Sequence, residues 1–220
     1  MNKTTQIDIK KHQIKAGDFI CFGKYDWLVL RVADDVLIIS KDIIEQRPYH
    51  HADFTITWEN CDLRKYLNNE FYSSFNEQER EYILQVRNEN PNNYWYGTNG
   101  GSDTDDYIFL LSLEDTDNYW GNSGDYVAKR RKRRDNDNSY PDNNGTVISN
   151  KYDAMRRAKC ESDWYWWWLR SPGRDDISAA HIGRSGRIGV VGSGVYGCSG
   201  GVRPALKLKL QYFAKTEVIK

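Results

Sequence analysis

Several features that commonly assign a function class are scarce or absent in this chain of 220 residues. It has 4 cysteines, none of them in a CxxC pair, and this scattered spacing does not fit a structural zinc site. It has no run of 18 apolar residues, so we expect no membrane-spanning helix. The formal net charge is zero, which argues against a protein that binds polyanions through its overall charge.

The N-terminal sequence gives no targeting signal either. Residues 1–18 contain no apolar segment of the kind that a signal peptide needs. Cysteines in a protein without an export signal are expected to stay reduced. We therefore expect a cytoplasmic protein with free thiols.

Aromatic residues, by contrast, are abundant: Phe, Trp and Tyr make up 14% of the chain, including 8 tryptophans. Four of these lie in the segment DWYWWWLRSPG at 163–173. Successive side chains of a strand face opposite sides, so Trp164, Trp166 and Trp168 would share one face. We predict a strand that is buried on both faces and ends in a Pro-Gly turn. A compatible second reading places Trp164 or Tyr165 at a rim, where the ring stacks on a ligand.

The rest of the sequence predicts a mixed α+β architecture. Apolar runs predict strands, and helical spacing predicts helices, in the following order: strands within 18–40, a helix over 59–75, a strand at 107–112, helices near 113–121 and 150–159, and a strand at 205–210. Asn76 and Glu79 have the spacing of a capping box at the start of a further helix. Antiparallel strands with segregated helices are typical of the α+β class.

We expect a single domain over 1–220. Its N-terminal α+β part spans 18–120, and its C-terminal part spans 151–210. Between them, residues 121–150 read as an exposed basic and polar insertion. Within the C-terminal part, residues 174–201 are rich in Gly and Ser and contain short strand-like pieces.

Two motifs, WWWLRSPG and GVRPAL, about 30 residues apart, resemble those of a bacterial family of unknown function. Five more blocks are similar to the same family in the same order: FGKYDWLVL, EQRPYHH, ITWENCDLRKYLNNEF, NYWYGTNGGSDTDDYIFLLSLED and KYDAMRRAK. The resemblance covers roughly residues 18–210. The tail GGVRPALKLKL is also similar to the closing strand of C-type-lectin-like folds of the formylglycine-generating-enzyme type. This resemblance implies a lectin-like scaffold for residues 151–210.

Some proteins with that fold are the variable proteins of diversity-generating retroelements, which display hypermutated residues on the scaffold. Residues 174–201 contain no Lys, Glu, Gln, Met or Trp, and randomised AAC or AAT codons cannot encode these five types. An ordinary Gly/Ser-rich loop region would show the same depletion, so both explanations remain. We expect non-enzymatic binding of a protein or other macromolecular ligand, as in paratopes. The candidate contact residues are Arg174, His181, Arg184, Arg187, Val190, Ser193, Val195, Tyr196, Cys198 and Ser199.

An acidic, glycine-rich segment offers a candidate cation site. Asp103, Asp105 and Asp106 cluster there, and closely spaced side-chain oxygens suit Ca²⁺. The spacing is not that of an EF-hand. A solvated acidic turn, or caps for the following elements, would give the same pattern. Apart from this possible Ca²⁺, we expect no cofactor.

Two competing functions stay open. A nucleic-acid-associated module would use a basic run whose side chains could contact phosphates, although charge runs are commonly just solvated. That run consists of Lys129, Arg130, Arg131, Lys132, Arg133 and Arg134. A degenerate relative of formylglycine-generating enzymes would act as an oxidase through cysteines, for which Cys160 and Cys198 are the candidates, in a context that does not match. His50 and His51 are expected to be loop or hydrogen-bonding residues rather than ligands of a three-histidine site.

Overall fold

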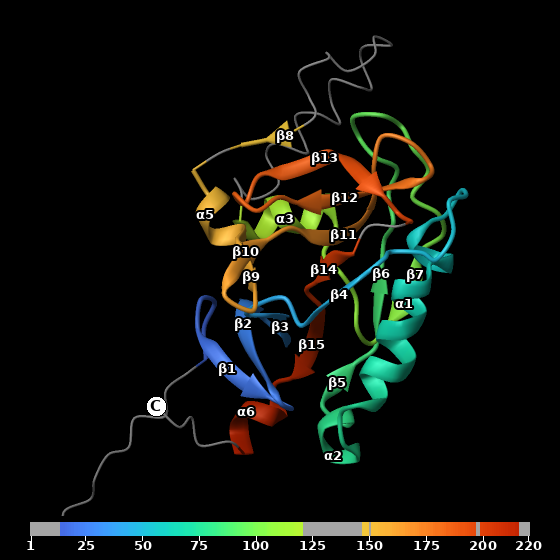
Figure 1. Cartoon of the computed structure of the whole chain (residues 1–220). Coiled ribbons are helices and arrows are strands. Elements are labelled where there is room, and N and C mark those ends of the chain that lie inside the picture. Colours follow the sequence, from blue (N-terminus) through green and yellow to red (C-terminus); the bar gives the residue numbers. More distant parts are fainter. Residues whose placement is uncertain (1–13, 121–146, 150, 197–198, 216–220) are drawn as a thin grey trace, which may run out of the picture.

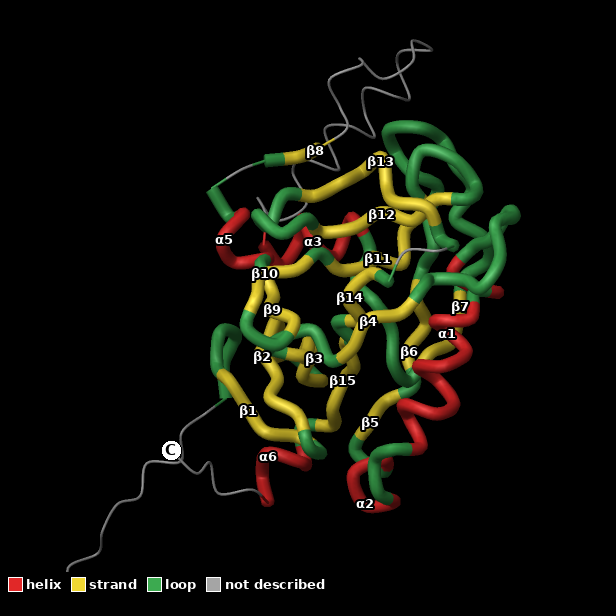
Figure 2. Tube along the Cα trace, viewed as in Figure 1, coloured by secondary structure: helices red, strands yellow, loops and turns green. Residues whose placement is uncertain are grey.

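The computed structural model describes residues 14–120, 147–149, 151–196 and 199–215. The protein has an α+β fold, as the sequence predicts, with mostly antiparallel sheets and a few short helices. Figures 1 and 2 show two main sheets, one above the other in this view, with α1 along one side of both. Among the described residues, no helix has the length and apolar character to cross a membrane.

The lower sheet has five strands in the order β1-β2-β3-β15-β5, and all neighbouring strands are antiparallel. Its strands are β1 (Phe19–Phe22), β2 (Tyr25–Val32), β3 (Asp35–Ser40), β15 (Ala205–Lys209) and β5 (Ile83–Leu84). The strands predicted within 18–40 are confirmed. The alternating segment predicted at 205–210 is β15, where Leu206 and Leu208 are fully buried and Leu210, beyond the strand, is 39% exposed.

The upper sheet has six strands in the order β4-β14-β11-β12-β13-β8. Its strands are β4 (Glu45–Arg47), β14 (Gly200–Val202), β11 (Trp167–Pro172), β12 (Ser178–Ile182), β13 (Ile188–Gly194) and β8 (Val147–Ile148). Only the β11–β14 pair is parallel. The segment 18–120 contributes β4 to this sheet, and the segment 151–210 contributes β15 to the lower one. Each main sheet therefore draws strands from both parts of the chain.

The remaining elements are short. They are the 3₁₀ helix η1 (Trp58–Asn60), α1 (Asp62–Tyr66), the π-helix η2 (Leu67–Phe71), α2 (Glu77–Arg80), α3 (Leu113–Trp120), α5 (Asp153–Arg156), α6 (Gln211–Lys215), and the paired strands β6 (Val86–Asn88) with β7 (Thr104–Asp106) and β9 (Ala158–Cys160) with β10 (Asp163–Tyr165). The helices predicted at 59–75 and near 113–121 are present. The capping box is confirmed, because Asn76 and Glu79 each accept a hydrogen bond from the other's backbone N–H at 2.9 Å.

The tryptophan segment is not one strand buried on both faces, so this prediction was wrong in part. Residues 163–165 form β10, which pairs with β9, and β11 starts only at Trp167. Trp167 and Trp168 are fully buried, whereas Trp164 is 40% exposed. The helix predicted at 150–159 is likewise shorter, because α5 ends at Arg156 and β9 follows it. Because 163–165 pair with β9, Trp164 lies outside the core, whereas Tyr165 still packs against it.

The run 107–112 is buried as predicted but forms no strand. Its backbone finds other partners. The Asn68 side chain accepts hydrogen bonds from the N–H groups of Tyr107 and Ile108 at 2.8 and 3.2 Å, and donates to the carbonyl oxygen of Ile108 at 2.9 Å. Phe109 makes an isolated bridge to Ala205. Because a side chain and one bridge satisfy these groups, a continuous ladder is not needed.

One hydrophobic core connects the two main sheets. At their junction lies Arg203 of the GVRPAL motif, which is 2% exposed. Its guanidinium donates to the backbone carbonyls of Ser40, Lys41 and Arg156 at 2.9, 3.1 and 3.3 Å. Burial lowers the pKa of Arg203 to about 10, which leaves the side chain charged at neutral pH. This arginine therefore joins the end of β3 to the last residue of α5.

Candidate ligand-binding site

The predicted contact residues of 174–201 have very different exposures. Arg174, Arg184, Arg187, Tyr196 and Ser199 are exposed, His181 and Ser193 are half-buried, and Val190 and Val195 are buried. Cys198 lies outside the described residues. This part of the chain therefore offers seven of the ten predicted side chains to a ligand, wholly or in part.

Val190 and Val195 are corrections to the predicted contact surface. Val190 is 0% exposed and Val195 is 1% exposed, and both belong to the hydrophobic core. The backbone around Val195 is also occupied, because its N–H donates to the carbonyl of Ile177 at 3.0 Å and its carbonyl accepts from the N–H of His50 at 3.1 Å. Both valines therefore stabilise the platform and are not available for recognition.

The exposed arginines do not form one patch. Arg184 and Arg187 lie in the turn between β12 and β13, beside α5 (Figure 1). Arg187 Nε is 4.0 Å from Asp153. Arg174 follows β11 at the other end of the sheet, where its carbonyl accepts a hydrogen bond from the Thr98 hydroxyl at 2.7 Å. A single small ligand would not reach both ends.

A row of rings and polar groups lies on one face of the upper sheet. It begins at Arg184, in the turn between β12 and β13. The Arg184 guanidinium lies 5.0 Å from the Tyr165 ring, which stacks on Trp166 with centroids 6.1 Å apart. Trp166 in turn contacts His181, with centroids 5.5 Å apart, and His181 Nδ1 is 3.3 Å from Ser193 Oγ. We call these five residues the aromatic face. Three of them were predicted as contact residues from the sequence.

Glycines of the sheet make room for these rings. A Cβ atom on Gly189 would lie 2.5 Å from the His181 ring, and one on Gly200 would lie 2.3 Å from the Trp168 ring and 2.6 Å from Trp166. No side chain fits at those distances, so the rings pack directly against bare glycine backbone. Part of the glycine content of 174–201 therefore serves close packing.

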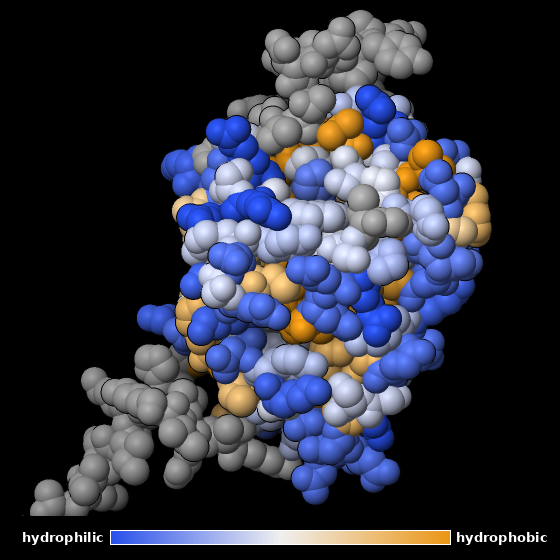
Figure 3. Space-filling view, in the orientation of Figure 1, coloured by the Kyte–Doolittle hydropathy of each residue, from blue (hydrophilic) through white to orange (hydrophobic). Residues whose placement is uncertain are grey.

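A groove of about 1030 Å³ adjoins the aromatic face. Trp164 stands in its wall with the Arg157 guanidinium stacked 3.8 Å from the ring. The groove carries charged groups of both signs beside its aromatic rings. It is lined by Ile43, Ile44, Glu45, Gln46, Arg157, Cys160, Glu161, Asp163, Trp164, Tyr165, Arg184 and Ser185. In Figure 3, side chains of intermediate hydropathy cross this side of the molecule at the level of β10 and β11, with hydrophobic ones just below them.

The groove and the aromatic face are continuous, since Tyr165 and Arg184 belong to both. Burial lowers the pKa of His181, so its ring is neutral at pH 7 and offers one donor and one acceptor. Stacked guanidinium and indole groups give large, rigid contact areas. This arrangement can hold a chain of mixed polar and apolar groups.

Comparison with known proteins gives one match. A family profile described as "Domain of unknown function (DUF6273)" matches residues 33–210. The chain belongs to this family. No curated protein and no solved structure matches it. The DUF6273 region begins two residues before β3 and includes every residue of the groove and of the aromatic face, whereas β1 and β2 lie outside it.

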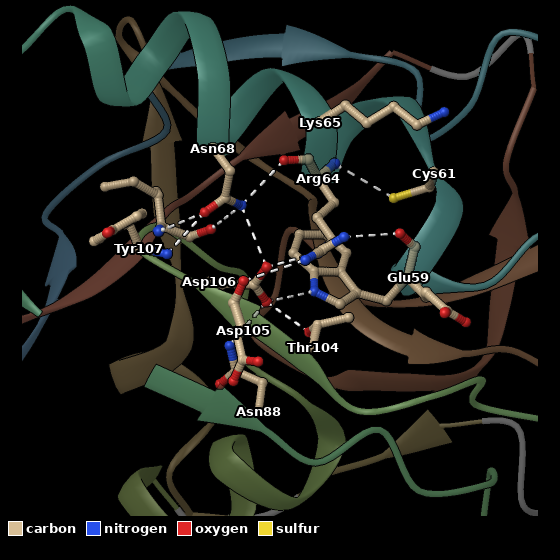
Figure 4. A network of polar contacts seen from close by, with 12 residues as sticks. Glu59, Cys61, Arg64, Lys65, Asn68, Asn88, Thr104, Asp105, Asp106 and Tyr107 are labelled. Carbon is tan, nitrogen blue, oxygen red and sulfur yellow. Dashed lines mark hydrogen bonds and ion pairs between the residues drawn. The ribbon is translucent and has the colours of Figure 1, made fainter. Parts of the chain in front are cut away.

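The acidic cluster of the DUF6273 region does not form the predicted cation site. β7 alternates its side chains, so Asp103 and Asp105 face Arg87 at 3.7 and 3.3 Å, while Asp106 points to the opposite side and is 0% exposed. Asp106 instead lies at the centre of a network of protein donors (Figure 4). These donors are Trp58 Nε1, Arg64 Nε, Asn68 Nδ2, Asn88 Nδ2 and Thr104 Oγ1, at 2.6 to 3.4 Å. The three carboxylates do not converge on a common point.

The basic run Lys129–Arg134 lies outside the described residues. The predicted insertion at 121–150 is described only at 147–149. Of the two candidate cysteines, Cys198 is also outside, and Cys160 lies in the groove, where its sulfur accepts a hydrogen bond from Gln46 Nε2 at 3.3 Å.

Sequence reasoning missed Arg157 and Trp166 as site residues. Arg157 had a weak local signal, because it lies in the same stretch as Trp164, which the second reading of the sequence places at a rim. Trp166 had none, because only the pairing of β11 with β12 brings its ring to His181.

Proposed function

We propose that this DUF6273 protein is a non-enzymatic binding protein whose ligand is an extended segment of another protein. The observation that carries the proposal is the continuity of the groove with the aromatic face through Tyr165 and Arg184. A segment lying in the groove would reach the aromatic face without leaving the surface. Exposed Trp, Tyr and Arg side chains are the types that contribute most to binding free energy at protein interfaces.

The charges of the groove favour a polypeptide over a nucleic acid. Three carboxylates, from Glu45, Glu161 and Asp163, line it together with Arg157 and Arg184. A phosphate backbone needs a cationic track, and these carboxylates would repel it. A peptide with basic and acidic side chains would find partners of both signs.

We further propose that the scaffold is of the C-type-lectin-like kind and that codons within 174–201 are diversified. The motif resemblance supports the scaffold, and the missing Lys, Glu, Gln, Met and Trp support the diversification. The burial of Val190 and Val195 reduces the number of positions that can be diversified, because changes at these core positions would create cavities or overpack the core. Diversified positions should thus be confined to exposed residues such as Arg174, Arg187 and Tyr196. An adenine-rich near-copy of these codons beside a reverse transcriptase gene would be the expected genomic finding, and its absence would contradict the diversification.

Selection from a random peptide library tests the binding function. Peptides enriched on the full-length protein should bind the variants Trp164→Ala and Arg184→Ala at least about 10-fold more weakly, since central contacts of this type contribute more than about 1.4 kcal/mol. Phe19→Ala is a matched control, because Phe19 is 59% exposed on β1 and does not line the groove. A selection that yields no binder, or binders that Trp164→Ala and Phe19→Ala affect equally, would contradict the proposal.

A further inference from the structure

We propose that His50, His51 and Asp62 form a binding site for a divalent transition-metal ion, with Zn²⁺ as the expected occupant. The site is separate from the aromatic face, and it does not depend on the proposed function. Each of the three side chains offers one ligand atom, and these atoms all lie within 4.8 Å of one another. Within the described part of the chain, no other group of three or more His, Cys, Asp or Glu side chains converges in this way.

The backbone holds the two ligand-bearing segments together. The N–H of Leu63 in α1 donates to the carbonyl of Tyr49 at 3.2 Å, so the start of α1 is tied to the residue that precedes the histidines. The Tyr49 hydroxyl donates to the carbonyl of Arg170 at 3.0 Å. The N–H of His51 also donates to Asp62 Oδ2 at 3.0 Å. The positions of all three ligands are therefore set by the fold before any ion binds.

The His50 ring lacks a satisfactory partner within the described protein. It is 3% exposed, and its Nδ1 lies 2.9 Å from Asp62 Oδ2. Neither Nδ1 nor Nε2 makes a hydrogen bond to a described residue. Buried polar groups are almost always paired. An ion bound at Nδ1 would supply that atom with the partner it lacks.

The donor set selects the class of ion. Two imidazoles and one carboxylate suit zinc and similar first-row metals, whereas Ca²⁺ and Mg²⁺ prefer oxygen ligands alone. In a tetrahedral zinc site the ligand atoms lie about 3.3 Å apart, close to the separation of His50 Nδ1 and Asp62 Oδ2. His51 Nδ1 contacts the same carboxylate oxygen. Small side-chain rotations would thus bring all three atoms to coordination distance.

The surroundings leave the site accessible. The His51 side chain is 72% exposed, so a fourth coordination position faces solvent. The Lys65 ammonium lies 3.7 Å from Asp62 Oδ1, the other carboxylate oxygen, and leaves Oδ2 to the histidines. The exposed Phe54 ring packs against the His50 ring with centroids 4.8 Å apart and covers one side. An ion here would link the segment after β4 to α1.

Isothermal titration of the full-length, EDTA-stripped protein with ZnCl₂ tests this site. We expect one ion per chain, with affinity lowered at least about 10-fold in each of His50→Gln, His51→Gln and Asp62→Asn. His12→Gln and Asp26→Asn serve as controls of the same chemistry elsewhere in the chain and should bind as the wild type does. Titration with Co²⁺ should give visible absorption typical of tetrahedral nitrogen and oxygen ligands.

Several results would overturn the proposal. One is the absence of stoichiometric zinc binding. Another is binding that survives both His51→Gln and Asp62→Asn, whose side chains are accessible enough for these variants to fold. A Co²⁺ spectrum dominated by thiolate charge transfer would place the ion on cysteine instead. Circular dichroism of each variant checks the fold, so that a defect in His50→Gln alone does not decide the outcome.

Discussion

Replacing Asp106 by asparagine should destabilise the protein strongly, although the two side chains have the same shape. Both carboxylate oxygens accept hydrogen bonds, Oδ1 from Arg64 Nε at 2.6 Å and Oδ2 from three donors at 2.7 to 3.1 Å. An amide nitrogen cannot accept, so either orientation of the new amide turns an NH₂ group toward an existing donor. The change also removes the buried partner of the Arg64 guanidinium.

The expected size follows from these losses. Removing one partner of a buried ion pair costs about 3–5 kcal/mol, and the lost charged hydrogen bonds are part of that figure. The free energy of unfolding of a typical domain is only about 5–15 kcal/mol. For a protein of this size, the loss corresponds to a fall in Tm of about 6–20 °C. Thermal and urea denaturation followed by circular dichroism would measure both quantities.

Asp105→Asn is the matched control, because it makes the same chemical change one residue away. The Asp105 side chain is 55% exposed and pairs with Arg87 at 3.3 Å. Exposed pairs contribute about 0–1 kcal/mol, so Tm should fall by no more than about 4 °C. The reasoning would be refuted if Asp106→Asn were as stable as Asp105→Asn. It would also be refuted if Ca²⁺ raised the Tm of the wild type and Asp106→Asn abolished that increase.

Two further predictions concern buried basic groups. Arg203→Met should lower the free energy of unfolding by about 3 kcal/mol in urea denaturation, because the carbonyls of Ser40 and Lys41 lose their donor; a change below about 1 kcal/mol would contradict this role. Burial lowers the pKa of His181 below its ordinary value, so the unfolded chain binds its proton first as pH falls. The stability contributed by the neutral ring should therefore decrease as pH falls below about 6.5. His181→Gln should reduce the slope of stability against pH in that range, and an unchanged slope would contradict it.

Much of the fold could be predicted because its signals are local. The capping box at Asn76 and Glu79 depends on residues three apart, and the alternation of 205–210 is a property of the strand itself. The strand predicted at 107–112 is absent because the hydrogen-bond partners of this segment are distant in sequence. Asn68 satisfies the backbone there, so an apolar run of strand-like composition became an irregular buried segment.

The candidate site was predictable only in part, for a related reason. Arg184 was found because a charged residue in a Gly/Ser-rich turn is expected to be exposed. Val190 and Val195 were misjudged because the composition of the whole stretch was read as one surface. Val190 lies in β13 and is buried in the core, and Val195, just after β13, is buried where its backbone bonds Ile177 and His50. The place of Trp166 beside His181 follows from strand register, which a single sequence does not reveal.

β15 is an interior strand of the lower sheet, between β3 and β5, and Arg203 just before it binds a carbonyl 163 residues earlier in the chain. During synthesis β1, β2 and β3 can pair soon after they emerge from the ribosome. The other edge of β3 stays unpaired until β15 has been synthesised. That open edge belongs to a strand whose residues are nearly all buried in the finished protein. Such late, long-distance pairing implies slow folding and a nascent chain that chaperones would have to protect from aggregation.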